Sequence, residues 1–101
     1  MTIKSTKIRE SARGESCTLN IFGVCNYNPE TVVLCHFPSE SKGIGKKSDD
    51  ISAGYGCSAC HDAVDGRNRS EEFRAHADQY MRQSIYRTQR RLIDKGLLVI
   101  K

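Results

Sequence analysis

The stretch Cys-Ser-Ala-Cys-His at residues 57–61 places two thiols close together and continues directly into a histidine. A second pair of thiols, Cys17 and Cys25, lies upstream, so four of the five cysteines are grouped two and two. Zinc in structural sites takes four ligands in a tetrahedron, and four thiolates from two short loops provide them readily. We therefore predict that Cys17, Cys25, Cys57 and Cys60 hold one structural zinc ion, which leaves the histidines free for chemistry.

The spacing of Cys57 and Cys60 also fits other uses of the thiols. A reactive dithiol has the same C-x2-C spacing, and with His61 the stretch matches the C-x-x-C-H pattern of covalent haem attachment. Some of the cysteines could also be free and buried. Haem attachment needs an exported chain, and we expect no export signal because residues 1–16 carry four basic side chains and no apolar block. The second pair of thiols favours zinc over these alternatives.

The length and composition predict a small domain whose fold would be stabilised by a bound metal ion. With 101 residues we expect one domain, and a chain of this size buries only about 60–65% of its unfolded surface. Structural zinc contributes about 10–16 kcal/mol of apparent binding energy to such a fold. The net charge of +4 suits a nucleic-acid partner. No stretch approaches the ~20 apolar residues of a membrane span, and we expect a cytoplasmic protein with reduced thiols.

The pattern of apolar and turn-forming residues predicts an α+β fold, a small zinc-anchored domain with an additional C-terminal helix. Residues 1–16 read as an irregular basic arm. The expected elements that follow are a strand over 31–37, a short strand or turn over 51–56, a short helix over 57–64, a long helix over 70–95 and a closing strand over 97–100. Ser70 is a good N-cap for the long helix, and Gly96 is a stop signal after it.

Two histidines lie on the elements that flank the metal ligands. His36 is near the end of the first predicted strand, and His61 opens the short helix 25 positions later. A strand histidine and a helix histidine resemble the site of the ββα-metal (HNH) nucleases. There the strand histidine takes a proton from water, and a divalent ion held partly by the helix histidine stabilises the charge on the phosphate. The alternative is that His61 caps its helix or joins the zinc shell, and that His36 is a satisfied residue at a strand end.

Basic side chains around these histidines are candidate phosphate contacts. The alternative for each of them is a solvated basic surface. They are Lys42, Lys46, Lys47, Arg67, Arg69 and Arg74.

Several short motifs together carry a more specific resemblance. They are Ser-Ala-Arg-Gly at 11–14, Cys17, Gly-Val-Cys-Asn at 23–26, Asn-Pro-Glu-Thr at 28–31, His36, and Cys-Ser-Ala-Cys-His-Asp at 57–62. Over most of its length the chain resembles the prophage-encoded nuclease family of the YbcO type. That family is similar to HNH endonucleases with a four-cysteine zinc and to phage recombination nucleases acting on branched DNA. The resemblance implies that His36 is the general base and that Cys17, Cys25, Cys57 and Cys60 are the zinc ligands.

Two positions depart from the HNH pattern. Cys35 stands directly before the expected base, where HNH enzymes place an Asp or His metal ligand, and a thiol is a poor ligand for Mg²⁺. The Asn that orients the base is also absent, with Asp50 or Ser52 the nearest substitutes. We expect Cys35 to be a buried strand residue, and an oxygen ligand to come from Asp50 or from an acid of the short helix, Asp62 or Asp65.

The function that we expect is metal-dependent cleavage of DNA, including branched or recombination intermediates. Its cofactors would be a structural zinc ion and a second divalent ion, Mg²⁺ or Mn²⁺, with His36 and His61 as the catalytic pair. The alternative is a non-catalytic, zinc-stabilised module that binds nucleic acid or a protein.

Overall fold

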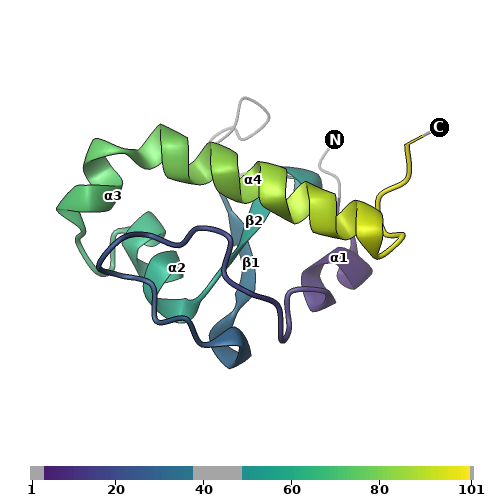
Figure 1. The fold of residues 1–101 in the computed structure, drawn as a ribbon, viewed down its shortest axis with the longest axis horizontal. Helices are drawn as coiled ribbons and strands as arrows, with labels where there is room; N and C mark the ends of the chain where they lie inside the picture. Colours follow the sequence, from purple (N-terminus) through teal and green to yellow (C-terminus); the bar gives the residue numbers. More distant parts are fainter. Residues whose placement is uncertain (1–3, 38–48, 101) are drawn as a thin grey trace.

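The computed structural model describes residues 4–37 and 49–100, and within them the chain forms a small α+β fold (Figure 1). Its centre is a two-stranded antiparallel sheet of β1 (Val33–His36) and β2 (Ala53–Gly56), with Val33 opposite Gly56 and His36 opposite Ala53. The long helix α4 (Ala77–Asp94) lies across the sheet, with α2 (Ser58–Asp65) and α1 (Thr6–Glu10) on either side of the strands. The predicted α+β class and the strand predicted over 31–37 are confirmed, and of the two alternatives for 51–56, strand or turn, the structure has the strand.

Two glycines let β2 pack closely on its neighbours. A Cβ atom added to Gly54 would lie 2.0 Å from the Ser84 hydroxyl of α4, and one added to Gly56 would lie 2.5 Å from the Cys35 sulfur of β1. Both distances are far shorter than a van der Waals contact, so only glycine permits this approach of backbone to side chain. All four residues of β2 are buried as a result.

The buried face of α4 is partly polar. Ser84 and Thr88 are fully buried beside Leu92. The Thr18 hydroxyl lies 2.6 Å from the Ser84 hydroxyl and 3.0 Å from the Thr88 hydroxyl. The Tyr55 amide donates to Thr88 at 3.0 Å. Because each hydroxyl has a partner, these polar groups are buried without an unpaired donor or acceptor.

The N-terminal arm differs from its prediction as irregular chain. Residues Thr6–Glu10 form α1, and Ser5 is its N-cap, with a hydroxyl that accepts a hydrogen bond from the Ile8 amide at 3.3 Å. Ile8 and Ala12 are both buried in the core. These two apolar residues explain why a mostly polar, basic segment becomes ordered.

The C-terminal third also differs from its prediction. In place of one helix over 70–95, α3 (Glu71–Ala75) and α4 are separated at His76, whose φ of −129° and ψ of 30° lie outside the helical region. Residues 97–100 form no strand. The Leu97 and Leu98 amides instead donate to the Leu92 carbonyl after the left-handed Gly96. This is the usual way in which a helix end satisfies its last carbonyls.

Short 3₁₀ turns precede both strands, Pro29–Thr31 before β1 and Asp50–Ser52 before β2. The second turn matters for the site because it places Asp50 beside the end of β1. Across the described part of the chain, no helix has the length and apolar character needed to span a membrane.

Candidate metal centre and active site

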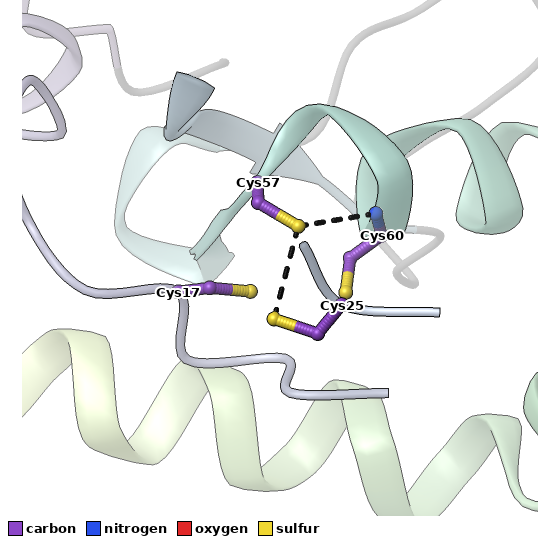
Figure 2. A group of neighbouring side chains, drawn as sticks. All are labelled: Cys17, Cys25, Cys57 and Cys60. Atoms are coloured by element: carbon purple, nitrogen blue, oxygen red, sulfur yellow. Dashed lines mark hydrogen bonds between the residues drawn. The ribbon is translucent and has the colours of Figure 1, made fainter. Parts of the chain in front are cut away.

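Four thiols from two segments of the chain converge on one point (Figure 2). The sulfur atoms of Cys17, Cys25, Cys57 and Cys60 all lie within 4.8 Å of one another, and those of Cys25 and Cys57 are 3.8 Å apart. Four sulfurs at about 2.3 Å from a zinc ion form a tetrahedron with edges of about 3.8 Å. The structure therefore brings together all four predicted ligands in a cluster that can hold a metal ion such as zinc.

Backbone amides point at two of these sulfurs. Cys57 is the N-cap of α2, and its sulfur accepts from the Cys60 amide and the Asn26 amide, both at 3.4 Å. The Cys17 sulfur accepts from the Asn20 amide at 3.4 Å. Hydrogen bonds to the charged form favour that form, so the Asn20 amide favours the thiolate of Cys17.

A bound cation would stabilise the ionised form of the four clustered thiols. The hydrogen bond from the Cys60 thiol lowers the pKa of Cys17 to about 5, whereas burial raises the pKa of Cys25 to about 11. The same hydrogen bond to Cys17, together with burial, raises the pKa of Cys60. Four thiolates cannot share this space alone, because each charge opposes the ionisation of the others. A divalent cation offsets that repulsion and makes four-sulfur ligation favourable.

Cys35 is excluded from the cluster. Its side chain is fully buried in β1, as predicted, and burial raises the pKa of its thiol well above the ordinary value. A protonated thiol in an apolar setting is a poor metal ligand. The residue before His36 therefore packs the sheet and supplies no hard ligand.

His36 is held by a buried carboxylate. Its Nε2 atom lies 2.7 Å from Oδ1 of Asp50, whose side chain has no exposed surface. Asp50 also accepts from the Ser5 amide at 2.6 Å and from Arg9 Nε at 3.2 and 3.3 Å. Asp50, one of two residues considered as a substitute for the orienting Asn, is thus the one in contact with His36.

The charge on Asp50 determines which nitrogen of His36 carries a proton. Burial alone would raise the pKa of Asp50, but the hydrogen bonds from His36, the Ser5 amide and Arg9 outweigh burial and hold that pKa below its ordinary value. An ionised carboxylate can only accept hydrogen bonds, so Nε2 of His36 is the donor. In the neutral ring, Nδ1 then keeps its lone pair and can accept a proton.

His61 lies on α2, as predicted, and its ion-pair partner is Asp65 of the same helix. Its Nε2 atom is 3.2 Å from Asp65 Oδ2, and Arg67 lies 2.8 Å from Asp65 and 3.3 Å from Asp62. Within residues 4–37 and 49–100, the four cysteines form the only group of three or more His, Cys, Asp or Glu side chains close enough to share an ion. The second metal site therefore stays a prediction.

Of the basic residues predicted to contact phosphate, some are paired with acids in the structure and others lie outside the described residues. Arg67 is paired with acids of α2, and Arg69 Nε lies 2.7 Å from Glu71. Lys42, Lys46 and Lys47 lie outside the described residues. Two arginines of the N-terminal segment, Arg9 and Arg13, lie next to His36 instead. In the sequence these arginines are visible only as part of a basic arm, because nothing local indicates that α1 folds back onto β1.

Comparison with known proteins agrees with the motifs. The family model described as "Putative nuclease YbcO" matches residues 6–97. The chain belongs to the YbcO family. It is 38% identical over 92 residues to "Putative nuclease YbcO" of Escherichia coli K12 and, equally, to "Putative nuclease ybcO" of Enterobacteria phage 82, covering 90% of this chain and 95% of each relative. The predicted YbcO family and its phage association are confirmed.

A solved structure gives the same fold. It is described as "a putative bacteriophage protein" from Escherichia coli K-12, is 35% identical in sequence, and superposes with a TM-score of 0.70 over 89% of this chain and all of that one. The arrangement of strands and helices is therefore shared with that bacteriophage protein.

Proposed function

We propose that the chain is a metal-dependent DNA endonuclease in which His36 is the general base. The observation that carries this proposal is the imidazole of His36, fixed at a strand end by the buried carboxylate of Asp50. The strand lies against β2, which leads directly into the cysteine-anchored helix α2. Membership of a family named for nucleases supports the same reaction.

The proposed first step is proton transfer from water to His36. Asp50 holds the Nε2–H, so Nδ1 takes the proton as the water oxygen attacks phosphorus. The bond from phosphorus to the leaving oxygen then breaks, and the leaving oxygen keeps the electron pair and takes a proton from solvent. The carboxylate of Asp50 stabilises the imidazolium that forms, in the way that a buried aspartate supports histidine in other hydrolases.

The four-thiol centre is structural in this scheme. A tetrahedron of thiolates leaves no open position for water or substrate. Its role is to join the segment of Cys17 and Cys25 to the start of α2, where Cys57 and Cys60 lie. This cross-link gives a thin core a fixed geometry near the strand that carries His36.

The second ion of the proposed reaction would be held by α2. His61 and Asp65 occupy positions i and i+4 of one helix face and already lie 3.2 Å apart, and Asp62 offers a further oxygen. Such an ion supplies positive charge to the phosphate and the leaving oxygen. A mixed imidazole and carboxylate set suits Mn²⁺ better than Mg²⁺, which prefers oxygen alone.

The proposed substrate is DNA in the cytoplasm, with branched recombination intermediates as the structural class. Nicking of supercoiled plasmid and of a four-way junction by zinc-loaded protein, with Mg²⁺, Mn²⁺, Co²⁺ or Ni²⁺ added in turn, tests the activity. Cleavage with at least one ion is the expected result. DNA binding without cleavage under every ion would instead favour the non-catalytic, zinc-stabilised module.

A further inference from the structure

A hollow of about 280 Å³ lies between the N-terminal segment and β1, next to His36. Arg9 and Arg13 line one part of it, and His36 with the apolar chain of residues 32–34 lines the rest. Sites for drug-sized molecules are usually about 300–1,000 Å³, so this hollow suits a smaller group. None of the described residues that line it is acidic.

The two arginines differ in what they already contact. Arg9 donates through Nε to the buried Asp50, and its side chain remains 42% exposed. Its other four N–H groups are not needed for that contact, since guanidinium carries five donors. The Arg13 side chain is exposed and forms no ion pair with any residue that the structure describes. Arg13 therefore presents a free cation at the edge of the hollow.

We propose that this hollow binds a phosphodiester group of DNA, with Arg13 as a direct phosphate ligand and Arg9 as a second ligand braced by Asp50. Guanidinium matches the geometry of phosphate oxygens through paired N–H donors. The inference rests on the proposed function in one respect. If His36 is the base, the bound phosphodiester is the one that is attacked, because His36 lines the same hollow.

The lining also indicates how the DNA is recognised. Besides the two arginines and His36, the described lining side chains are Val32, Val33 and Leu34, and Val33 is 43% exposed. Both arginines are assigned to phosphate, and no amide or carboxylate side chain is among the described lining residues to read the edge of a base. Contacts limited to phosphate and sugar fix position but carry no sequence information. We therefore expect this site to bind the DNA backbone irrespective of sequence.

The test measures how binding of a short DNA duplex depends on salt, without added divalent ion so that no cleavage occurs. Each phosphate contact contributes about −0.9 to the slope of log K against log salt. Arg13→Gln should flatten the slope by about 0.9 and weaken binding about eightfold at about 0.1 M salt, equally for unrelated sequences. Arg13→Lys keeps the charge and should retain the slope. Arg82→Gln, at a side chain 83% exposed on α4, removes the same charge as a control and should leave the slope unchanged.

Wild-type slope and affinity in Arg13→Gln would overturn the proposal. A parallel titration with inorganic phosphate separates DNA from free anion. If phosphate binds as tightly as the duplex, and only when Arg13 is present, the hollow is an anion site and the assignment to DNA is wrong. Cleavage of DNA is measured in a separate assay. If Arg13→Gln flattens the salt slope but the wild-type protein never cleaves DNA, the phosphate site is supported and the nuclease activity is refuted. If cleavage depends on His36 but Arg13→Gln keeps the wild-type salt slope, the nuclease activity is supported and the phosphate site is refuted.

Discussion

Replacing Asp50 by Asn should disturb both the stability of the fold and the state of His36. The carboxylate accepts from three donors, the Ser5 amide, Arg9 Nε and His36 Nε2, and it is fully buried. An amide has one accepting oxygen and one NH₂ group, so the NH₂ must face one of the three. Only His36 can accept, by moving its proton from Nε2 to Nδ1. Asp50→Asn is therefore expected to reverse the tautomer of His36.

The magnitudes follow from these contacts. Hydrogen bonds to a charged group contribute about 1.5–3 kcal/mol each and neutral ones about 0.5–1.5. Replacing the charged acceptor by a neutral one in all three hydrogen bonds lowers the free energy of unfolding by about 3 kcal/mol. Part of this loss is offset because the variant no longer buries a charge. We expect a net loss of about 2 kcal/mol, which lowers Tm by about 10 °C in a domain of this size. With Nδ1 protonated the ring cannot serve as base, and cleavage should slow by about 10²–10⁴-fold.

Thermal unfolding and single-turnover cleavage of zinc-loaded protein measure both effects, with Asp78→Asn, at a side chain 85% exposed, as the control. The pKa of Asp50 is held below its ordinary value of 3.8. Its contribution is therefore fully present above that value and is lost only as pH falls through the lower, folded pKa. The difference in stability between wild type and variant should persist from about pH 8 down to about pH 5. A variant as stable and as active as wild type would refute the role given to this carboxylate.

Three further changes probe the scaffold. Cys57→Ser should lose its stoichiometric metal, measured by elemental analysis, and should be unfolded, as judged by circular dichroism. Cys35→Ala should keep its metal, because Cys35 is not one of the ligands. Equal metal content in the two variants would contradict the assigned ligands. Gly54→Ala forces a methyl group onto the Ser84 hydroxyl and should lower the free energy of unfolding by about 1–3 kcal/mol in urea titrations, a loss that a neutral result would disprove. Thr88→Val leaves a buried backbone N–H without its acceptor and should lose about 1–3 kcal/mol in the same assay, so unchanged stability would argue against the hydroxyl network.

Local patterns were enough to predict the parts of the molecule that depend on neighbours in sequence. The grouping of four thiols, the β-branched run ending at His36 and the helix following Cys57 each follow from short-range spacing. The N-cap at Ser70 was also readable, and its hydroxyl does accept from the Phe73 amide. These features require no knowledge of how distant segments pack.

Long-range packing decided the rest. The pairing of Asp50 with His36 and Arg9 joins residues 14 and 41 positions apart, and only the missing Asn of the HNH pattern pointed to Asp50. Helix α1 becomes ordered because its apolar residues reach the core, which a polar, basic composition concealed. The burial of Ser84 and Thr88 could not be predicted from their polar character, because their partner Thr18 lies far away in the sequence.

The most direct test of the proposed general base compares His36→Ala with His76→Ala in single-turnover cleavage of DNA by zinc-loaded protein. His76 is exposed at the junction of α3 and α4 and serves as the matched control. If His36 is the general base, His36→Ala cleaves at least about 100-fold more slowly with its zinc content unchanged, while His76→Ala cleaves like wild type. Cleavage by His36→Ala at the wild-type rate would contradict the assignment of His36 as the base.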